Sequence, residues 1–412
     1  MDEINKELAK LKLVQDSRIN DVFTPHSPVK KHINLVGRAD LAVSLIKNIV
    51  KPGSHSLLYG DRGVGKSSLA NAVIDMILQQ IYSGEIIRLS CDSTDTFESI
   101  VVEPLRMAGV NLDLSQTSRG VETSRVISAE VKSPVGGGGA SAGQKNQASE
   151  TYTHNTNALS PSWVGNKIKG LSCLIVIDEF DAIVNDEDKS KVAEMLKYLS
   201  DNSDTVNVVL VGIGKNASDL TAGHPSVGRC LSELHVGRMA ETELRKIVTD
   251  GAEKVGLVFD IDIVNKIVKI SAGYPYFTHL IALHCAEQAV INGRRFITFD
   301  HLHQALIQAV ESSKSSIGAD YFKAIRGGKS AEYKRVLLAA AKCDGSEFTV
   351  GELSAKLSEM LNVSVTPDSF TRFLQNNTST NCHGLFRRVR TGIYQFIDPR
   401  MPSFIFMENQ QF

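Results

Sequence analysis

The sequence predicts an α/β fold in which a parallel sheet with a phosphate-binding loop is followed by a helical domain and a C-terminal domain. The pattern Gly-x-x-x-x-Gly-Lys-Ser, at residues 60–67, lies between an apolar run and a helical run. Apolar runs at 173–177 and 206–212 are separated by helical sequence at 189–200, which is the alternation of a parallel sheet. From residue 240 onward, helical patterns follow one another without strands.

The composition is that of an ordinary globular protein with more than one domain. A chain of 412 residues exceeds what one hydrophobic core serves, and 42% of its residues are apolar. The net charge of -1 gives no overall attraction to nucleic acid, so DNA contact would need a local patch. The six cysteines form no C-x-x-C pair, which is typical of a reducing compartment. Without a signal-like start or a membrane-length apolar run, we expect a cytoplasmic protein with no membrane partner.

The segments around the loop show helical and strand patterns. Residues 2–16 predict a helix with one apolar face, expected to pack on the body of the protein, with subunit contact as the alternative. That face consists of Ile4, Leu8, Leu11 and Val14. A turn at 34–40 leads into a helix that ends near Pro52, and a strand at 85–90 precedes a helix at 96–108.

Residues 113–163 are rich in Ser, Thr, Gly and Asn and show neither a helical nor a strand period. We expect a mobile insertion, serving either as an inert surface loop or as a binding arm.

The phosphate loop carries the first group of candidate site residues. Its glycines let backbone N–H groups approach an anion, and the next helix begins at the same point. Lys66 is expected to reach the β- and γ-phosphates and the Ser67 hydroxyl to bind Mg²⁺, so ATP and Mg²⁺ are the expected cofactors. The alternative is a glycine-rich turn without a ligand. The candidate nucleotide contacts are Gly60, Asp61, Arg62, Gly63, Val64, Gly65, Lys66, Ser67 and Ser68.

An acidic pair follows the apolar run that ends at residue 177. Both carboxylates therefore emerge at the edge of the sheet that carries the phosphate loop. We assign Asp178 to Mg²⁺ and Glu179 to the base that activates water for attack on the γ-phosphate. An acidic pair that opens a solvated helix is the alternative, and the role of Asp181 stays open.

Two further polar positions follow the strands. Asn216, after the run at 206–212, is a candidate contact for the attacking water or the γ-phosphate; Lys215 competes with it, as does an ordinary strand-exit turn. Arg229 is a candidate arginine finger for a neighbouring subunit, against a surface arginine in a local ion pair. His224 is expected to be structural.

The second half of the chain predicts a helical domain and a small C-terminal domain. Helical patterns cover 240–255, 260–271, 275–291 and 299–314, and a linker at 326–329 follows. Three more helices, at 331–342, 349–361 and 367–375, precede a hairpin around Thr391-Gly392. This order resembles a winged helix, whose expected contacts with duplex DNA are Arg372, Arg387, Arg388 and Arg390. Protein contact is the alternative.

Taken together, these motifs resemble an AAA+ ATPase over about residues 30–315, most closely the origin-recognition and replication-initiator branch. The resemblance implies that Val36, Gly37 and Arg38 contact the adenine base of the nucleotide. It also implies a homo-oligomer with ATP at its subunit boundaries. The implied parts are an N-terminal helix and arm at 1–30, a nucleotide-binding domain at 31–239, a lid at 240–325 and a winged helix at 330–412.

The lid departs from the family pattern because no arginine follows Gly273 at the position that usually faces the γ-phosphate. Gly273-Tyr274-Pro275 is similar to the signal-transducing STAND NTPases, which implies that Pro275 and His279 contact the nucleotide and that hydrolysis is slow. Two functions follow. In one, ATP controls assembly on DNA or a protein partner, as in replication initiation, transposition or phage defence. In the other, a STAND-like switch recruits a separate effector. A metabolic kinase is disfavoured because no small-substrate pattern follows the loop.

Overall fold

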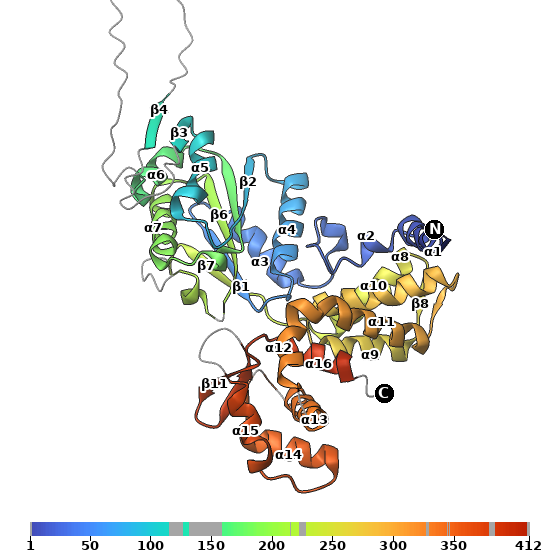
Figure 1. The fold of residues 1–412 in the computed structure, drawn as a ribbon. Helices are drawn as coiled ribbons and strands as arrows, with labels where there is room; N and C mark the ends of the chain where they lie inside the picture. The colour runs from blue at the N-terminus through green and yellow to red at the C-terminus, as the bar shows by residue number, and fades with distance from the viewer. Residues whose placement is uncertain are drawn as a thin grey trace, which may run out of the picture. The chain divides into compact units, whose positions relative to one another are not determined.

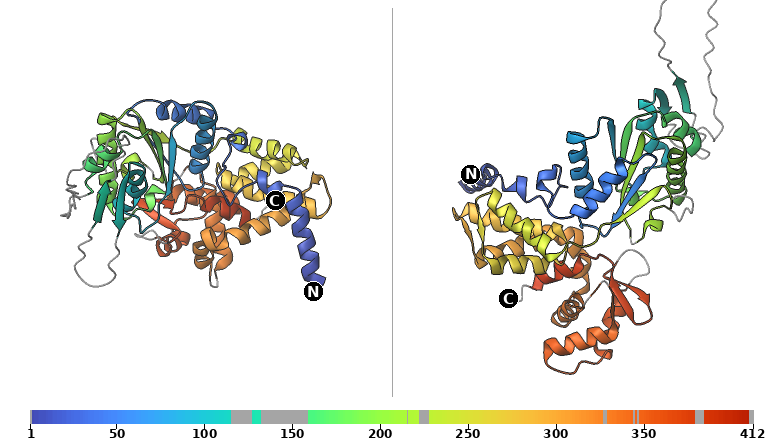
Figure 2. Two further views of the ribbon diagram at one scale, coloured as in Figure 1. Left: turned by 90° about the horizontal axis from the view of Figure 1, so that it is seen from above. Right: turned by 180° about the vertical axis from the view of Figure 1, so that it is seen from behind.

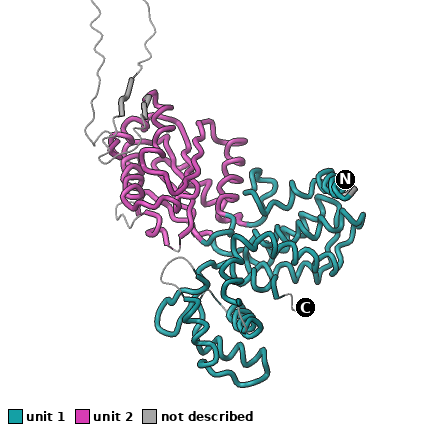
Figure 3. Tube along the Cα trace, viewed as in Figure 1, with its two compact units in different colours: residues 1–37, 61–65, 237–412 teal, residues 38–60, 66–236 magenta. Residues whose placement is uncertain are grey.

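The computed structural model describes residues 2–114, 127–131, 159–214, 216–221, 228–326, 329–343, 345, 347–378 and 384–409. The chain divides into two compact units (Figure 3). Unit 1 comprises residues 1–37, 61–65 and 237–412, and unit 2 comprises residues 38–60 and 66–236. The interior of the phosphate loop therefore groups with unit 1, while both of its flanks group with unit 2.

Unit 2 is built on a five-stranded sheet with the order β2-β5-β6-β1-β7. Every pairing is parallel, which confirms the predicted fold class. The strands are β1 (His55–Gly60), β2 (Glu85–Ser90), β5 (Cys173–Asp178), β6 (Val206–Ile213) and β7 (Leu231–His235). The sequence did not predict β7, because this edge strand alternates in burial and has no apolar run.

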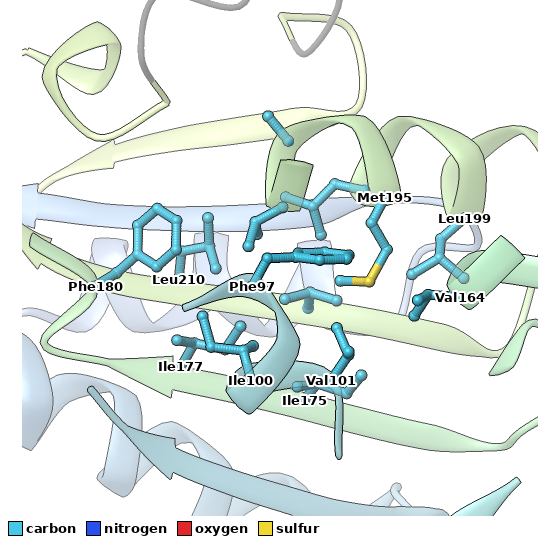
Figure 4. Packing of buried hydrophobic residues seen from close by; sticks show 14 of the residues in the cluster. Phe97, Ile100, Val101, Val164, Ile175, Ile177, Phe180, Met195, Leu199 and Leu210 are labelled. Atoms are coloured by element: carbon cyan, nitrogen blue, oxygen red, sulfur yellow. The ribbon is translucent and has the colours of Figure 1, made fainter. Parts of the chain in front are cut away.

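Helices cover both faces of this sheet (Figure 1). One face carries α3 (Ala39–Ile49) and α4 (Lys66–Gln80), and the other carries α5 (Phe97–Met107), α6 (Pro161–Ile168) and α7 (Asp186–Asn202). Phe97, Phe180 and Met195 pack between the second helical layer and the strands (Figure 4). Apolar strands buried on both faces explain the continuous runs that predicted them.

The predicted insertion contains structure that its composition concealed. β3 (Val110–Leu114) and β4 (Ile127–Val131) pair as an antiparallel hairpin, so the expectation of no strand is wrong for residues 127–131. Residues 115–126 and 132–158 lie outside the described residues, and the expected mobility falls there.

His55 is the buried polar centre of unit 2. Its Nδ1 accepts a hydrogen bond from Val208 N at 3.1 Å, and its Nε2 lies 3.0 Å from Leu196 O. The ring is therefore a neutral tautomer that donates through Nε2 and accepts through Nδ1. Burial lowers the pKa of His55 to about 4.

We expect the stability of unit 2 to fall as the pH is lowered from about 6.5 to about 4. In this window the unfolded chain binds a proton on His55 while the folded chain does not, which disfavours folding by about 3 kcal/mol at the acid end. Urea titrations at several pH values, followed by fluorescence of the single tryptophan, Trp163 on α6, measure this. The His55→Asn variant should show a shallower pH dependence, and an unchanged slope would contradict the assignment.

Unit 1 contains the predicted lid helices. They are α8 (Glu241–Lys254), α9 (Ile261–Ser271), α10 (Pro275–Ile291) and α11 (Phe299–Ser313), extended by a π-helical turn (Lys314–Gly318) and α12 (Ala319–Ala324). The two-residue strands β8 (Val258–Phe259) and β9 (Phe296–Ile297) pair in parallel. Tyr274 and Phe277 are fully buried at the start of α10, which fixes this helix among its neighbours.

The C-terminal segment of unit 1 has the helices and hairpin expected from the sequence, with two additions. The elements are α13 (Ser330–Ala341), β10 (Glu347–Thr349), α14 (Val350–Leu361), α15 (Asp368–Asn376), β11 (Phe386–Arg390), β12 (Ile393–Phe396) and α16 (Met401–Asn409). The unpredicted strand β10 completes a sheet with the order β10-β12-β11. The unpredicted helix α16 packs on α9, α11 and α13, and Ser403 Oγ donates to Ser271 O at 3.1 Å.

The N-terminal helix α1 (Asp2–Asp16) forms as predicted but does not bury its apolar face. Ile4, Leu8 and Leu11 are 60%, 57% and 59% exposed, and Val14 alone of the four is buried. Its first turns project beyond the other helices of unit 1 (Figure 2). The expected packing is therefore wrong for three of the four positions. Among the described residues, no helix combines the length and apolar character needed to cross a membrane.

Candidate nucleotide-binding site

The phosphate loop has the backbone geometry that its glycines predict. Gly60 ends β1 and Lys66 begins α4, so residues 61–65 form the connection between them. Gly60, Gly63 and Gly65 have φ values of 150°, 81° and 94°, which side chains disfavour. A Cβ at Gly60 would also clash with Val236 O. Lys66 Nζ donates to Gly60 O at 3.1 Å, which holds the buried ammonium beside the loop.

The structure brings the loop flank and the acidic strand end together within unit 2. Ser67 Oγ donates to Asp178 Oδ1 at 3.1 Å. Asp178 ends β5, and Ser67 lies in the first turn of α4, so the contact spans 111 positions of sequence. The two oxygens expected to share Mg²⁺ are therefore neighbours.

Glu179 follows Asp178 in a constrained conformation. Its φ of 56° lies in the left-handed region, which is uncommon for a residue with a side chain. Its backbone N donates to Asp178 Oδ1 at 2.9 Å, and its Oε2 accepts a bond from Ser90 Oγ at 3.4 Å. Ser90 ends β2, so the carboxylate is oriented across the carboxyl edge of the sheet. Strained residues of this kind recur at functional sites.

Asp181 has a structural partner. Its Oδ1 accepts a hydrogen bond from Ile213 N at 2.7 Å, which ties the exit of β5 to the end of β6. This contact assigns Asp181 a positioning role within the sheet edge.

The protein side chains at this site could hold a metal ion only if a bound nucleotide supplied further ligands. Within the described ranges, no group of three or more His, Cys, Asp or Glu side chains is placed to hold a metal ion. Mg²⁺ commonly uses one or two protein oxygens and takes its other ligands from phosphates and water. The neighbouring oxygens of Ser67 and Asp178 match that requirement.

The interior of the loop, in unit 1, is covered by the start of α10 and by the segment before α16. Tyr274 Oη donates to Asp61 Oδ2 at 3.2 Å. A Cβ at Gly65 would lie 3.7 Å from Pro275 Cγ, and one at Gly63 would lie 3.3 Å from Arg400 Cδ. The Arg400 guanidinium is buried and donates to both Asp398 oxygens, at 3.0 and 2.7 Å. The lid and the C-terminal segment therefore both contact the loop.

The residues expected to contact the nucleobase lie at the point in the sequence where unit 1 gives way to unit 2. Gly37 has a φ of 70°, and a Cβ there would displace the Glu243 side chain, so this position favours glycine. Arg38, with a φ of 62°, precedes α3. Val36 is half-buried.

The His279 side chain contacts the N-terminal arm. Its Nδ1 accepts a hydrogen bond from Thr24 N at 3.3 Å, and its ring packs edge-on against Phe23. Burial lowers the pKa of His279 to about 4, which keeps the ring neutral. The phosphate contact implied by the resemblance therefore has no support in this geometry.

The remaining catalytic candidates lie at or near the ends of β6 and β7. Asn216 is exposed and its backbone N donates to Asp219 Oδ2 at 3.1 Å, as in an ordinary strand-exit turn. Arg229 is exposed and pairs with Asp201, the local ion pair named as the alternative. Lys215 and His224 lie outside the described residues.

The four arginines expected to bind DNA fall into two groups. Arg372, Arg388 and Arg390 are exposed on α15 and β11. Arg387 instead donates through Nε and Nη2 to Gln395 Oε1, at 3.0 and 2.7 Å. This cross-strand bond gives Arg387 a structural role in the hairpin.

Sequence reasoning missed the residues that reach the site from a distance. Ser90 and Arg400 belong to no motif, and the Gly273-Tyr274-Pro275 pattern did not assign Tyr274 itself a contact. These residues meet Glu179 or the loop only in the folded chain. The position of Ser90 at the end of a strand was the one available signal, because polar residues at such ends face the ligand edge.

A parallel sheet with a phosphate loop after its first strand, and with an acidic pair beside that loop, defines a P-loop NTPase of the AAA+ type. The chain belongs to the novel STAND NTPase 1 family, which matches residues 30–311. This membership confirms the expected relation to the STAND NTPases and the expected enzyme class, hydrolysis of a nucleoside triphosphate.

Solved structures of other proteins have a similar fold. The Walker-type ATPase PABY2304 of Pyrococcus abyssi matches with a TM-score of 0.51 and 15% identity, over 93% of this chain and 99% of that chain. The ORC1 protein of Aeropyrum pernix, solved in complex with DNA, matches with a TM-score of 0.48 and 15% identity, over 94% of this chain and 96% of that chain. At this identity the Pyrococcus abyssi match supports the fold alone. Among curated proteins, none matches the chain.

Proposed function

We propose that the protein is an ATP-driven molecular switch whose nucleotide state is read by its lid and C-terminal segment. The observation that carries the proposal is the packing of the loop interior, where Tyr274 bonds to Asp61 and Arg400 lies against Gly63. A change of phosphate at the loop would act directly on these contacts. The switch would then control assembly with a separate effector protein.

The chemistry we assign to the site uses the residues of the loop and the acidic pair. Lys66 and the loop amides would bind the phosphates of ATP, and Ser67 and Asp178 would hold Mg²⁺. The metal, when bound, would neutralise charge on the phosphates. Glu179 would orient and deprotonate the attacking water, with Ser90 fixing its carboxylate.

We further propose the division into arm, nucleotide-binding domain, lid and winged helix that the sequence indicates. The order α13, β10, α14, α15, β11, β12 supports a winged helix in the C-terminal part. In a homo-oligomer with ATP at subunit boundaries, Arg229 would exchange Asp201 for the neighbouring nucleotide.

The switch predicts slow release of ADP that depends on Tyr274. The Tyr274→Phe variant loses the hydrogen bond to the Asp61 carboxylate, and we expect roughly tenfold faster ADP release. Stopped-flow release of a fluorescent ADP analogue measures this. Tyr276→Phe is the matched control, because no described hydrogen bond links its hydroxyl to the loop and its ring remains. Equal release rates in both variants and the wild type would count against the switch.

A second candidate function is binding of duplex DNA by the C-terminal segment, which the exposed Arg372, Arg388 and Arg390 favour. Side chains on a helix and an adjacent hairpin can contact phosphates and a groove together. DNA that stimulates ATP turnover would support this candidate, whereas turnover indifferent to DNA would favour the effector-recruiting switch.

If DNA binds there, the Arg388→Ala, Arg390→Ala double variant should weaken binding at all sequences. Each lost phosphate contact lowers the slope of log affinity against log salt by about 1, so we expect a reduction of about 2. Arg387→Ala is the control, because this side chain is bonded to Gln395. Fluorescence anisotropy at several salt concentrations measures the slope, and an unaltered slope in the double variant would move the DNA site elsewhere.

A further inference from the structure

A cavity of about 300 Å³ lies within unit 1, and its described lining includes no residue of the phosphate loop. Its wall is formed by the end of α9, the segment that precedes α8, the end of α13, the sheet of the C-terminal segment and α16. The volume is that of a small ligand site.

The cavity has a strongly positive rim. Arg238, Lys269 and Lys342 line it, and no acidic side chain is found among its described lining residues. The carbonyl ends of α9 and α13 also face this region, but each contributes only about half a negative charge. The three full positive charges therefore exceed the total negative charge of the two helix ends, and the cavity favours an anion.

The inner wall is apolar and aromatic. Phe348 and Phe396 are buried, Phe406 is half-buried, and all three line the cavity. Rings of this kind stack on a planar group. Charged side chains at the rim and aromatic rings inside match a ligand with a planar apolar ring and an anionic group.

Arg238 connects this cavity to the nucleotide site. Its guanidinium stacks on the Tyr274 ring, 4.9 Å from the centroid. The Tyr274 hydroxyl in turn donates to Asp61 in the phosphate loop. A ligand that engages Arg238 would therefore act on the residue that covers the loop.

We propose that this cavity binds a small aromatic phosphate and that the bound ligand regulates nucleotide release. The proposal that the ligand binds depends only on the cavity, whereas the proposal that it regulates nucleotide release rests on the proposed switch.

Phenyl phosphate is the probe, added to the full chain and followed by isothermal titration calorimetry. We expect binding that is at least tenfold stronger than that of phenol or of inorganic phosphate. Lys269→Glu and Lys342→Glu, both at exposed positions, should each weaken it at least tenfold, and Lys246→Glu on α8 is the charge-matched control. Lys66→Ala should leave it unchanged. Binding that is lost in Lys66→Ala, or is equal in the three charge-reversed variants, would overturn the site.

Regulation is tested separately by release of a fluorescent ADP analogue. Phenyl phosphate should change the release rate at least threefold in the wild type and not in Lys342→Glu. Normal phenyl phosphate binding with an unchanged release rate would refute regulation and leave the site standing. Fast ADP release under every condition would instead count against the proposed switch.

Discussion

The Lys66→Ala variant should bind ATP at least about 100-fold more weakly than the wild type. The Lys66 ammonium lies buried beside the loop, bonded to Gly60 O, where the β- and γ-phosphates would take its place as partner. Charge-assisted hydrogen bonds contribute about 1.5–3 kcal/mol each, so loss of two corresponds to this change. Isothermal titration calorimetry with Mg·ATP measures it.

Lys47→Ala, at an exposed position of α3, is the control for removal of a lysine from unit 2. Its affinity should equal that of the wild type. Equal ATP affinity in Lys66→Ala and Lys47→Ala would remove the loop from the nucleotide site.

The Glu179→Gln variant should retain ATP binding but hydrolyse it about 10²- to 10⁴-fold more slowly. A glutamine keeps the size of the side chain and can still bond to Ser90, but it cannot accept a proton from the attacking water. Single-turnover hydrolysis separates this chemical step from product release, which is expected to be slow in the wild type.

Glu187→Gln, at an exposed position in the first turn of α7, is the matched control and should hydrolyse ATP normally. Normal single-turnover hydrolysis in Glu179→Gln would show that another group activates the water.

The sequence was informative wherever structure and chemistry are encoded by contiguous residues. The phosphate loop was predicted from residues 60–67 because backbone geometry and ligand type follow from one short glycine-rich pattern. Asp178 was placed correctly beside Ser67 because strands of a parallel sheet end at one edge. The lid helices α8, α9 and α11 were predicted because their apolar faces repeat with the helical period.

The features that were missed depend on contacts between distant residues or lack a period. Tyr274 and Asp61 are 213 positions apart, and nothing local to either predicts their hydrogen bond. Helix α16 is apolar on nearly every side, so it shows no amphipathic pattern, and β10 has only three residues. The resemblance implied a phosphate contact for His279, but the burial of this ring against Phe23 is a tertiary property that the sequence does not show.

The claim that the loop and the acidic strand end hold one metal ion is tested most directly by a double-mutant cycle of Ser67→Ala and Asp178→Asn. The measured quantity is the gain in ATP affinity that Mg²⁺ provides to each variant. Because both side chains are proposed to act through the same ion, each single variant should lose most of that gain, and the double variant should lose little more. Independent, additive losses, or a magnesium effect that survives in either single variant, would contradict the shared site.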